Sequence, residues 1–139
     1  MSTDTDRIRA LNDQLRRHLT GGKAVMTPGV AALGSEAVQR LVQTIAIFDD
    51  FCTANDPHGE HDFGAFEFEG APIMFKIDYY DKDLNFHSPN PADPAVTERV
   101  LTIMLAEEYW APQHLSSTRL RNIDRSLRDQ SHRHAHAEL

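Results

Sequence analysis

The sequence predicts a single α+β domain, in which a small, mostly antiparallel sheet with a central β-hairpin packs against three helices. Two periodicities support this prediction: three segments repeat apolar residues every three or four positions, and a middle segment alternates apolar with polar residues. The resulting order of helix, strand, helix, hairpin, short strand and helix is that of an α+β domain. A chain of 139 residues with 40% hydrophobic residues can bury one core of this kind.

Two amphipathic helices are predicted in the first part of the chain, over residues 4–19 and 36–51. Their apolar residues form one stripe on each helix: Ile8, Leu11, Leu15 and Leu19 in the first, and Val38, Leu41, Val42, Ile45 and Phe48 in the second. Residues 23–27 are a candidate strand that ends at Pro28-Gly29. Both helices need a shared sheet to cover their apolar stripes.

A β-hairpin is predicted around Glu69-Gly70, because apolar and polar residues alternate on both sides of this pair. The residues of one face are apolar and are predicted to join the core: Phe66, Phe68, Ile73, Phe75 and Ile77. The opposite face is predicted to carry mainly polar and aromatic residues: His61, Phe63, Glu67, Lys76, Asp78 and Tyr80. A two-residue turn places His61 opposite Asp78, whereas a four-residue turn places it opposite Tyr80.

The rest of the chain is predicted to hold a short strand at residues 84–87 and a third helix at about 94–110, with Asp93 as its N-cap. The apolar stripe of this helix contains five residues: Val96, Val100, Leu101, Met104 and Leu105. The domain is predicted to span residues 1–110. Residues 111–139 are predicted to be an appended tail, with one short helix and then a disordered His-rich end.

Negative charge is concentrated in the middle of the chain. Residues 51–110 contain twelve acidic and three basic residues, whereas the whole chain has a net charge of −7. Phosphate contacts need clustered Lys and Arg, so we expect no direct binding of nucleic acid by the core. An acidic face of this kind is typical of a protein that binds a basic partner or a cation, or that gains solubility from its charge.

The N-terminal segment has no apolar region of the kind found in a signal peptide, and no apolar stretch is long enough to span a bilayer. We therefore expect a cytoplasmic protein without a membrane partner. Cys52 is the only cysteine, so one chain can form neither an intramolecular disulfide nor a cysteine-based zinc site.

Several motifs resemble those of a known protein family. The segments GEHDFGAFE, FKIDYYD, RVLTIMLAEEY, RIRALNDQLRR and VMTPGVAAL occur between residues 6 and 109. They resemble a family of small bacterial proteins that is described as a domain of unknown function and occurs largely in alphaproteobacteria, often on plasmids. The resemblance implies no activity, catalytic residue or cofactor, and it hints at an accessory role in a mobile element.

A cluster of possible metal ligands precedes and crosses the predicted hairpin. It contains four candidates: His58, Glu60, His61 and Asp78. Imidazole and carboxylate groups suit zinc, manganese or iron, but their spacing matches no recognised metal motif. The favoured interpretation is that His61 hydrogen-bonds Asp78 or Tyr80, and no cofactor is expected. A His61–Asp78 pair can also serve as a general base, although no nucleophile accompanies it except an unsupported Cys52.

The leading functional hypothesis is a small, non-enzymatic binding or regulatory module. Its predicted binding residues lie on the acidic face of the hairpin: His61, Phe63, Glu67, Asp78, Tyr80 and Asp81. The expected partner is a protein, which in a mobile-element setting can be a host nucleic-acid enzyme. The alternative hypothesis is a metal-dependent hydrolase centred on the four candidate ligands. Either a monomer or a homodimer is compatible with the sequence.

Overall fold

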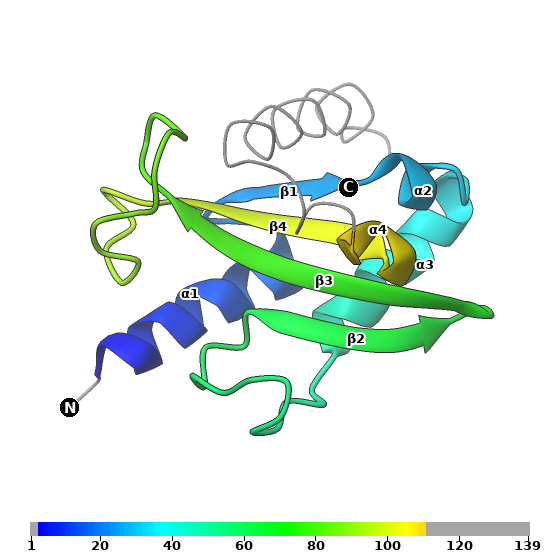
Figure 1. The fold of residues 1–139 in the computed structure, drawn as a ribbon, viewed down its shortest axis with the longest axis horizontal. Coiled ribbons are helices and arrows are strands. Elements are labelled where there is room, and N and C mark those ends of the chain that lie inside the picture. Colours follow the sequence, from blue (N-terminus) through cyan, green and yellow to red (C-terminus); the bar gives the residue numbers. More distant parts are fainter. Residues whose placement is uncertain (1–2, 111–139) are drawn as a thin grey trace.

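The computed structural model describes residues 3–110 of the protein (Figure 1). The predicted tail, with its short helix and His-rich end, lies outside these residues. The helices are α1 (Asp4–His18), α2 (Pro28–Ala31), α3 (Ser35–Ile47) and α4 (Ala106–Trp110). The strands are β1 (Lys23–Met26), β2 (Phe63–Phe68), β3 (Ala71–Tyr80) and β4 (Glu98–Leu105). Within residues 3–110, no helix has both the length and the apolar composition needed to cross a bilayer.

The four strands form one sheet in the order β1-β4-β3-β2. The β1–β4 pair is parallel, while β4–β3 and β3–β2 are antiparallel, so the predicted mostly antiparallel α+β fold is confirmed. The hairpin occupies one side of the sheet, with β3 inside and β2 at the edge. Helices α1 and α3 cover one face of the sheet, and α4 lies over the other (Figure 1).

The hairpin has the two-residue turn, which is one of the two turn lengths that the sequence left open. Phe68 pairs with Ala71 across the turn, which is made by Glu69 and Gly70, both with positive φ. Two positive φ angles in succession match the twist of a type I′ hairpin. Four of the predicted inner residues are buried: Phe68, Ile73, Phe75 and Ile77. Phe66, the fifth, packs against the same core, so the predicted inner face is confirmed.

The predicted third helix is wrong over most of its length. Residues Glu98–Leu105 form β4, and only Ala106–Trp110 are helical. Six consecutive residues of β4 are buried because β4 lies between two other strands and both of its faces are covered. A continuous apolar run of this kind fits a helix stripe and a doubly buried strand equally well, and burial on both faces selects the strand.

The predicted strand at residues 84–87 is reduced to one isolated bridge between His87 and Tyr80. The predicted helix start at Asp93 is instead a turn, in which Oδ1 of Asp93 accepts a hydrogen bond from the backbone N–H of Ala95 (2.9 Å). The other predicted elements are confirmed with small shifts of their ends, including α1, β1 and α3.

Helix α3 ends at Ile47 because Phe48 takes an extended conformation and a side chain from α1 satisfies the exposed carbonyls. Nη1 of Arg16 lies 2.9 Å from the carbonyl oxygen of Ile45, 3.1 Å from that of Ala46 and 2.8 Å from that of Phe48. A buried guanidinium at this helix end also complements the helix dipole. Helices α1 and α3 are therefore joined by a polar cap in addition to their apolar stripes.

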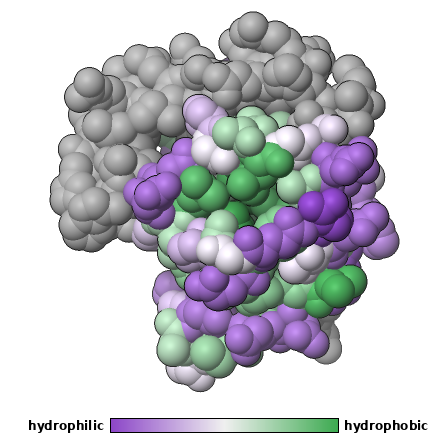
Figure 2. Space-filling model, turned by 90° about the vertical axis from the view of Figure 1, so that its right-hand side faces the viewer, coloured by the Kyte–Doolittle hydropathy of each residue, from purple (hydrophilic) through white to green (hydrophobic). Residues whose placement is uncertain are grey.

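The end of the molecule that carries the hairpin tip has a mostly hydrophilic surface, with a hydrophobic area framed by polar side chains (Figure 2). Three large hydrophobic side chains of the described residues are exposed: Leu33, Ile47 and Phe86. The first two flank α3, whereas Phe86 belongs to the segment after β3, next to His87.

Gly64 on β2 lies directly against the aromatic rings of Phe75 and Phe48. A Cβ at this position would lie 2.3 Å from Cε2 of Phe75 and 2.7 Å from Cε1 of Phe48. We predict that Gly64→Ala lowers the free energy of unfolding by about 1 to 3 kcal/mol through overpacking. Urea denaturation measures this. Ala65→Ser, at the exposed next residue, is the control and should change stability by less than about 0.5 kcal/mol.

Candidate functional site

The loop that leads into β2 is fixed to α1 by hydrogen bonds. Oδ1 of the buried Asp56 accepts hydrogen bonds from the backbone N–H groups of Glu60 (3.0 Å) and His61 (3.1 Å). Nη1 of Arg9 donates to the carbonyl oxygen of Gly59 (2.9 Å). The acidic loop is therefore held in one conformation by side chains from its own sequence and from α1.

His61 lies on the helix-covered side of the sheet. Its φ of 56° is left-handed and interrupts the strand alternation just before β2 begins. The ring stacks on Phe51 with centroids 3.9 Å apart, and Nδ1 lies 3.0 Å from Oδ1 of Asp13. Nε2 lies 3.8 Å from Oδ2 of Asp56. The predicted contact between His61 and Asp78 is therefore wrong, because the alternation that predicted it stops at residue 62.

Asp13 connects His61 to the helix cap. Its Oδ1 also accepts a hydrogen bond from Nη2 of Arg16 (2.9 Å). Burial alone would raise the pKa of Asp13, but the hydrogen bonds and positive charges of Arg16 and His61 lower it below its ordinary value. The carboxylate is thus a structural anion between two elements, and its charge is stabilised by the fold.

A buried polar network centred on Asn12 joins α1 to β3 and β4. The Asn12 amide nitrogen donates to the Tyr79 hydroxyl (2.8 Å) and to the Glu60 carbonyl (3.0 Å), and its Oδ1 accepts from Nε of Arg99 (2.7 Å). The Tyr79 hydroxyl in turn donates to Oε1 of Glu60 (2.8 Å). Asn12 is 0% exposed and Arg99 is 1% exposed, so the bonds of Asn12 with Tyr79 and Arg99 are buried, whereas the two bonds to Glu60 are partly buried.

Arg99 and Tyr79 also contact through the aromatic ring, with the guanidinium carbon 5.1 Å from the ring centroid. Burial lowers the pKa of Arg99, while Tyr79 and Glu60 oppose this shift, and the guanidinium stays charged. Burial raises the pKa of Tyr79 far above its ordinary value, although the hydrogen bond from Asn12 opposes it. Tyr79 is therefore a neutral hydrogen-bond donor that cannot act as a base.

The ring of Tyr79 forms one wall of a cavity at the edge of the sheet. The pairing of β2 with β3 ends at Phe63 and Lys76, after which the N–H of Ile77 still bonds the Asp62 carbonyl (2.8 Å). Further along β3, the Tyr79 carbonyl accepts from the N–H of Ser88 (3.0 Å). The two segments that flank β3 leave room between these bonds for a cavity of about 320 Å³.

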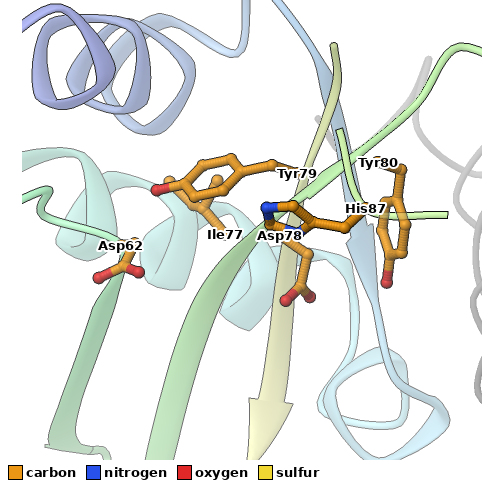
Figure 3. A pocket seen from close by; sticks show the side chains of 6 residues that line it. All are labelled: Asp62, Ile77, Asp78, Tyr79, Tyr80 and His87. Carbon is orange, nitrogen blue, oxygen red and sulfur yellow. The ribbon is translucent and has the colours of Figure 1, made fainter. Parts of the chain in front are cut away.

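We name this cavity the edge notch. It is lined by six residues: Asp62, Ile77, Asp78, Tyr79, Tyr80 and His87. Asp62 lies at one end and Tyr80 at the other, with the rings of Tyr79 and His87 and the carboxylate of Asp78 between them (Figure 3). Two carboxylates, three rings and one aliphatic side chain thus meet in one hollow that is partly open to solvent.

Asp62 has an unfavourable electrostatic environment. Burial raises its pKa above the ordinary value, and the nearby carboxylates of Glu60 and Asp56 raise it further, whereas a hydrogen bond with its own backbone and the charge of His58 oppose this shift without cancelling it. A carboxyl group with a perturbed pKa in a cavity is a candidate functional group. A cation placed in the edge notch would supply the positive charge that Asp62 lacks.

Asp78 and Tyr80 lie on the sheet face opposite α1 and α3. Oδ2 of Asp78 pairs with Nζ of Lys76 (2.7 Å), so this carboxylate is partly neutralised. Tyr80 packs against the small second core formed by Val25 and Val100. Because both residues belong to the long central strand β3, the wall that they form is rigid.

The other predicted binding residues lie apart from the edge notch or serve the fold. Phe63 is covered by α4, with its ring 6.0 Å from that of Tyr109. Glu67 is exposed on β2. Oδ1 of Asp81 accepts a hydrogen bond from the N–H of Asn85 (2.9 Å) and shapes the turn after β3.

The predicted metal ligands do not come together. His58 is exposed on the loop, Glu60 bonds Tyr79, and His61 contacts Asp13 rather than Asp78. Within residues 3–110, no group of three or more His, Cys, Asp or Glu side chains is arranged to hold a metal ion. The described part of the chain therefore offers no ready-made site for the metal-dependent alternative.

Sequence reasoning missed the polar partners from α1 and β4. Asn12 and Arg16 follow Ile8 at intervals of four residues, so both lie on the apolar face of a helix. This spacing is a signal for buried polar groups. Arg99 and His87 gave no comparable signal, because one was assigned to a helix and the other to a strand.

A family comparison places this fold among related sequences. The family model described as "Protein of unknown function (DUF3768)" matches residues 26–108. The chain belongs to this family. The DUF3768 range contains β2, β3, β4 and every residue of the edge notch, while α1 precedes it. No curated protein and no solved structure gives a significant match to the chain. The sequence-based resemblance to a family of unknown function is thus confirmed.

Removing the Asn12 side chain should destabilise the whole domain. Asn12→Ala leaves Nε of the charged Arg99 without an acceptor and the buried Tyr79 hydroxyl without a donor, while the bond from Nη2 of Arg99 to the Pro91 carbonyl remains. We expect the free energy of unfolding to fall by about 2 to 4 kcal/mol, measured by urea denaturation. Arg17→Ala, at an exposed position of the same helix, should cost less than about 0.5 kcal/mol. Equal effects of the two variants would contradict a central role for Asn12.

Asp13 should make stability depend on acid pH. Its folded-state pKa is lower than the ordinary value of 3.8, so its contribution is complete above pH 3.8 and is lost as the pH falls through the folded-state pKa. Asp13→Asn should therefore cost about 1 to 2 kcal/mol at pH 7 and progressively less below pH 4. Thermal unfolding at several pH values measures the difference. Asp4→Asn, in an exposed ion pair, should show almost none.

Proposed function

We propose that this protein is a non-enzymatic binding module whose edge notch receives a positively charged side chain of a protein partner. The observation that carries this proposal is Asp62, a carboxylate kept in a cavity where burial and like charges oppose its ionisation. Such a group costs stability in the free protein, and a bound cation would offset this cost. Aromatic walls beside the carboxylates add favourable contacts for a cation.

A protein partner fits this surface better than a free small molecule does. The edge notch is partly open to solvent, and the exposed His87 lines it. The residue before His87 is Phe86, which is 71% exposed. Exposed aromatic residues beside polar groups are typical of protein recognition surfaces. The acidic balance of residues 51–110 would attract a basic partner over a longer range. Host nucleic-acid enzymes, which line their phosphate sites with Lys and Arg, belong to this class.

The alternative of a hydrolase has less support. The histidine that sequence reasoning assigned as a general base is enclosed by Asp13, Asp56 and Phe51, and it lies on the other side of the sheet from Asp78. Tyr79 is neutral and fully engaged by Asn12 and Glu60. The edge notch thus contains groups that can bind a positive charge. None of its six lining residues is an activated nucleophile.

The test replaces Asp62 with its neutral isostere and measures both binding and stability. Asp62→Asn should weaken the binding of a labelled hexapeptide of alternating lysine and arginine by about tenfold, as followed by fluorescence anisotropy at low salt. The same variant should have a higher melting temperature than the wild type as the pH rises above 3.8, the ordinary pKa of the carboxyl group, because it removes a carboxylate whose ionisation the fold opposes. A binding loss without unfolding separates recognition from folding.

Glu67→Gln is the matched control. It removes the same charge from an exposed position of the same hairpin, outside the edge notch, and should change peptide affinity by less than twofold. Unchanged peptide binding by Asp62→Asn would refute the proposed function, and equal losses in both variants would reduce it to a general attraction by surface charge.

A further inference from the structure

We propose that the edge notch is specific for the guanidinium of an arginine side chain over the ammonium of a lysine. This inference rests on the proposed function and adds the chemical identity of the group that enters. It depends on three properties of the cavity: the placement of its two carboxylates, the rings that line it, and the lysine that already pairs with one of its carboxylates.

The two carboxylates enter the edge notch from different segments, one from the loop before β2 and one from β3, and they lie apart in it (Figure 3). Asp62 precedes β2 and lies at one end, whereas Asp78 belongs to β3 and lies among the rings (Figure 3). A guanidinium carries five N–H donors in one plane and can bond two acceptors that lie on different sides of it. An ammonium is a compact charge and gains most when its acceptors surround it closely. The observed arrangement therefore favours the planar group.

The lining of the edge notch also suits a flat and weakly hydrated cation. Ile77 is apolar, and the rings of Tyr79, Tyr80 and His87 supply planar surfaces. Guanidinium groups stack on aromatic rings and lose less on leaving water than ammonium groups do. The protein already contains such a contact, because the guanidinium carbon of Arg99 lies 5.1 Å from the centroid of the Tyr79 ring.

Lys76 adds a reason for the same preference. Its ammonium nitrogen lies 2.7 Å from Oδ2 of Asp78, so an incoming cation must share this carboxylate with a positive charge that is already present. A guanidinium spreads its charge over three nitrogens and can approach the carboxylate from one side. A second ammonium would place a concentrated charge near the first and would be repelled more strongly.

The experiment compares three capped tripeptides that differ only in the central residue: arginine, lysine or the neutral arginine isostere citrulline, each between two glycines. Each is titrated into the full-length protein, and binding is followed by the backbone amide shifts of Asp62, Asp78 and Tyr80 in NMR spectra. We expect the arginine peptide to bind at least about fivefold more tightly than the lysine peptide, and the citrulline peptide at least about tenfold more weakly than the arginine peptide.

Two variants make the outcome decisive. Asp62→Asn should weaken the binding of the arginine and lysine peptides alike, because it removes charge. His87→Ala, at an exposed position, should leave the fold intact and reduce the arginine preference to less than about twofold, because it removes a stacking surface. Retention of the full preference in His87→Ala would overturn the stacking account of specificity.

The remaining results separate the inference from the function on which it rests. Equal affinities for the arginine and lysine peptides, both lost in Asp62→Asn, would overturn the arginine preference and leave the proposed function standing. Absence of shifts at Asp62 and Asp78 with either charged peptide would overturn both. Binding of the citrulline peptide as tight as that of the arginine peptide would show that positive charge is not what the edge notch recognises.

Discussion

The hydrogen bonds of the Asn12 amide are the interaction on which the arrangement of this protein depends. A single side chain from α1 satisfies a hydroxyl on β3, a guanidinium on β4 and a carbonyl of the loop before β2. Buried polar groups of this kind tolerate few alternatives, because each misplaced element leaves a donor or acceptor unpaired in a medium of low polarity. The network thus fixes where Tyr79 lies, and Tyr79 is a wall of the edge notch. The recognition proposed for the edge notch therefore depends on polar contacts in the core.

Sequence periodicity could predict most of the fold but little of the site. The stripes of α1 and α3 and the alternation around Glu69-Gly70 reflect burial on one side only, which leaves a readable period. β4 is buried on both faces and lacks the alternation of a half-buried strand, so its apolar residues also fitted the stripe of a helix. Near the site, the left-handed conformation of His61 interrupts the alternation of the strand. His61 and Asp78, which were predicted to be in contact, therefore lie on opposite sides of the sheet. Local conformation of this kind is set by tertiary contacts, here by Asp56 and Asp13, which no period encodes.

The acidic residues of α1 and of the middle of the chain fall into two physical classes. Asp13 and Asp56 accept hydrogen bonds from other groups of the protein, and these bonds stabilise the native state. Asp62 gains little from its neighbours, and Asp78 shares one lysine. Net charge alone cannot distinguish these classes, because only the structure shows which carboxylates have few hydrogen-bond donors or positive charges near them. A binding function inferred from an acidic composition therefore has to be checked against the contacts that each carboxylate makes in the structure.

The hydrogen bonds of Arg16 to the end of α3 bear on which fragments of this protein keep their native contacts. The carbonyls at the end of α3, the His61 ring and the Arg99 guanidinium all lie in the range shared with the family, yet each has a partner on α1, which precedes that range. A fragment that begins at residue 26 would leave all three without these partners and would also lack most of the edge strand β1. The range of sequence similarity thus excludes contacts that join α1 to the rest of the described structure.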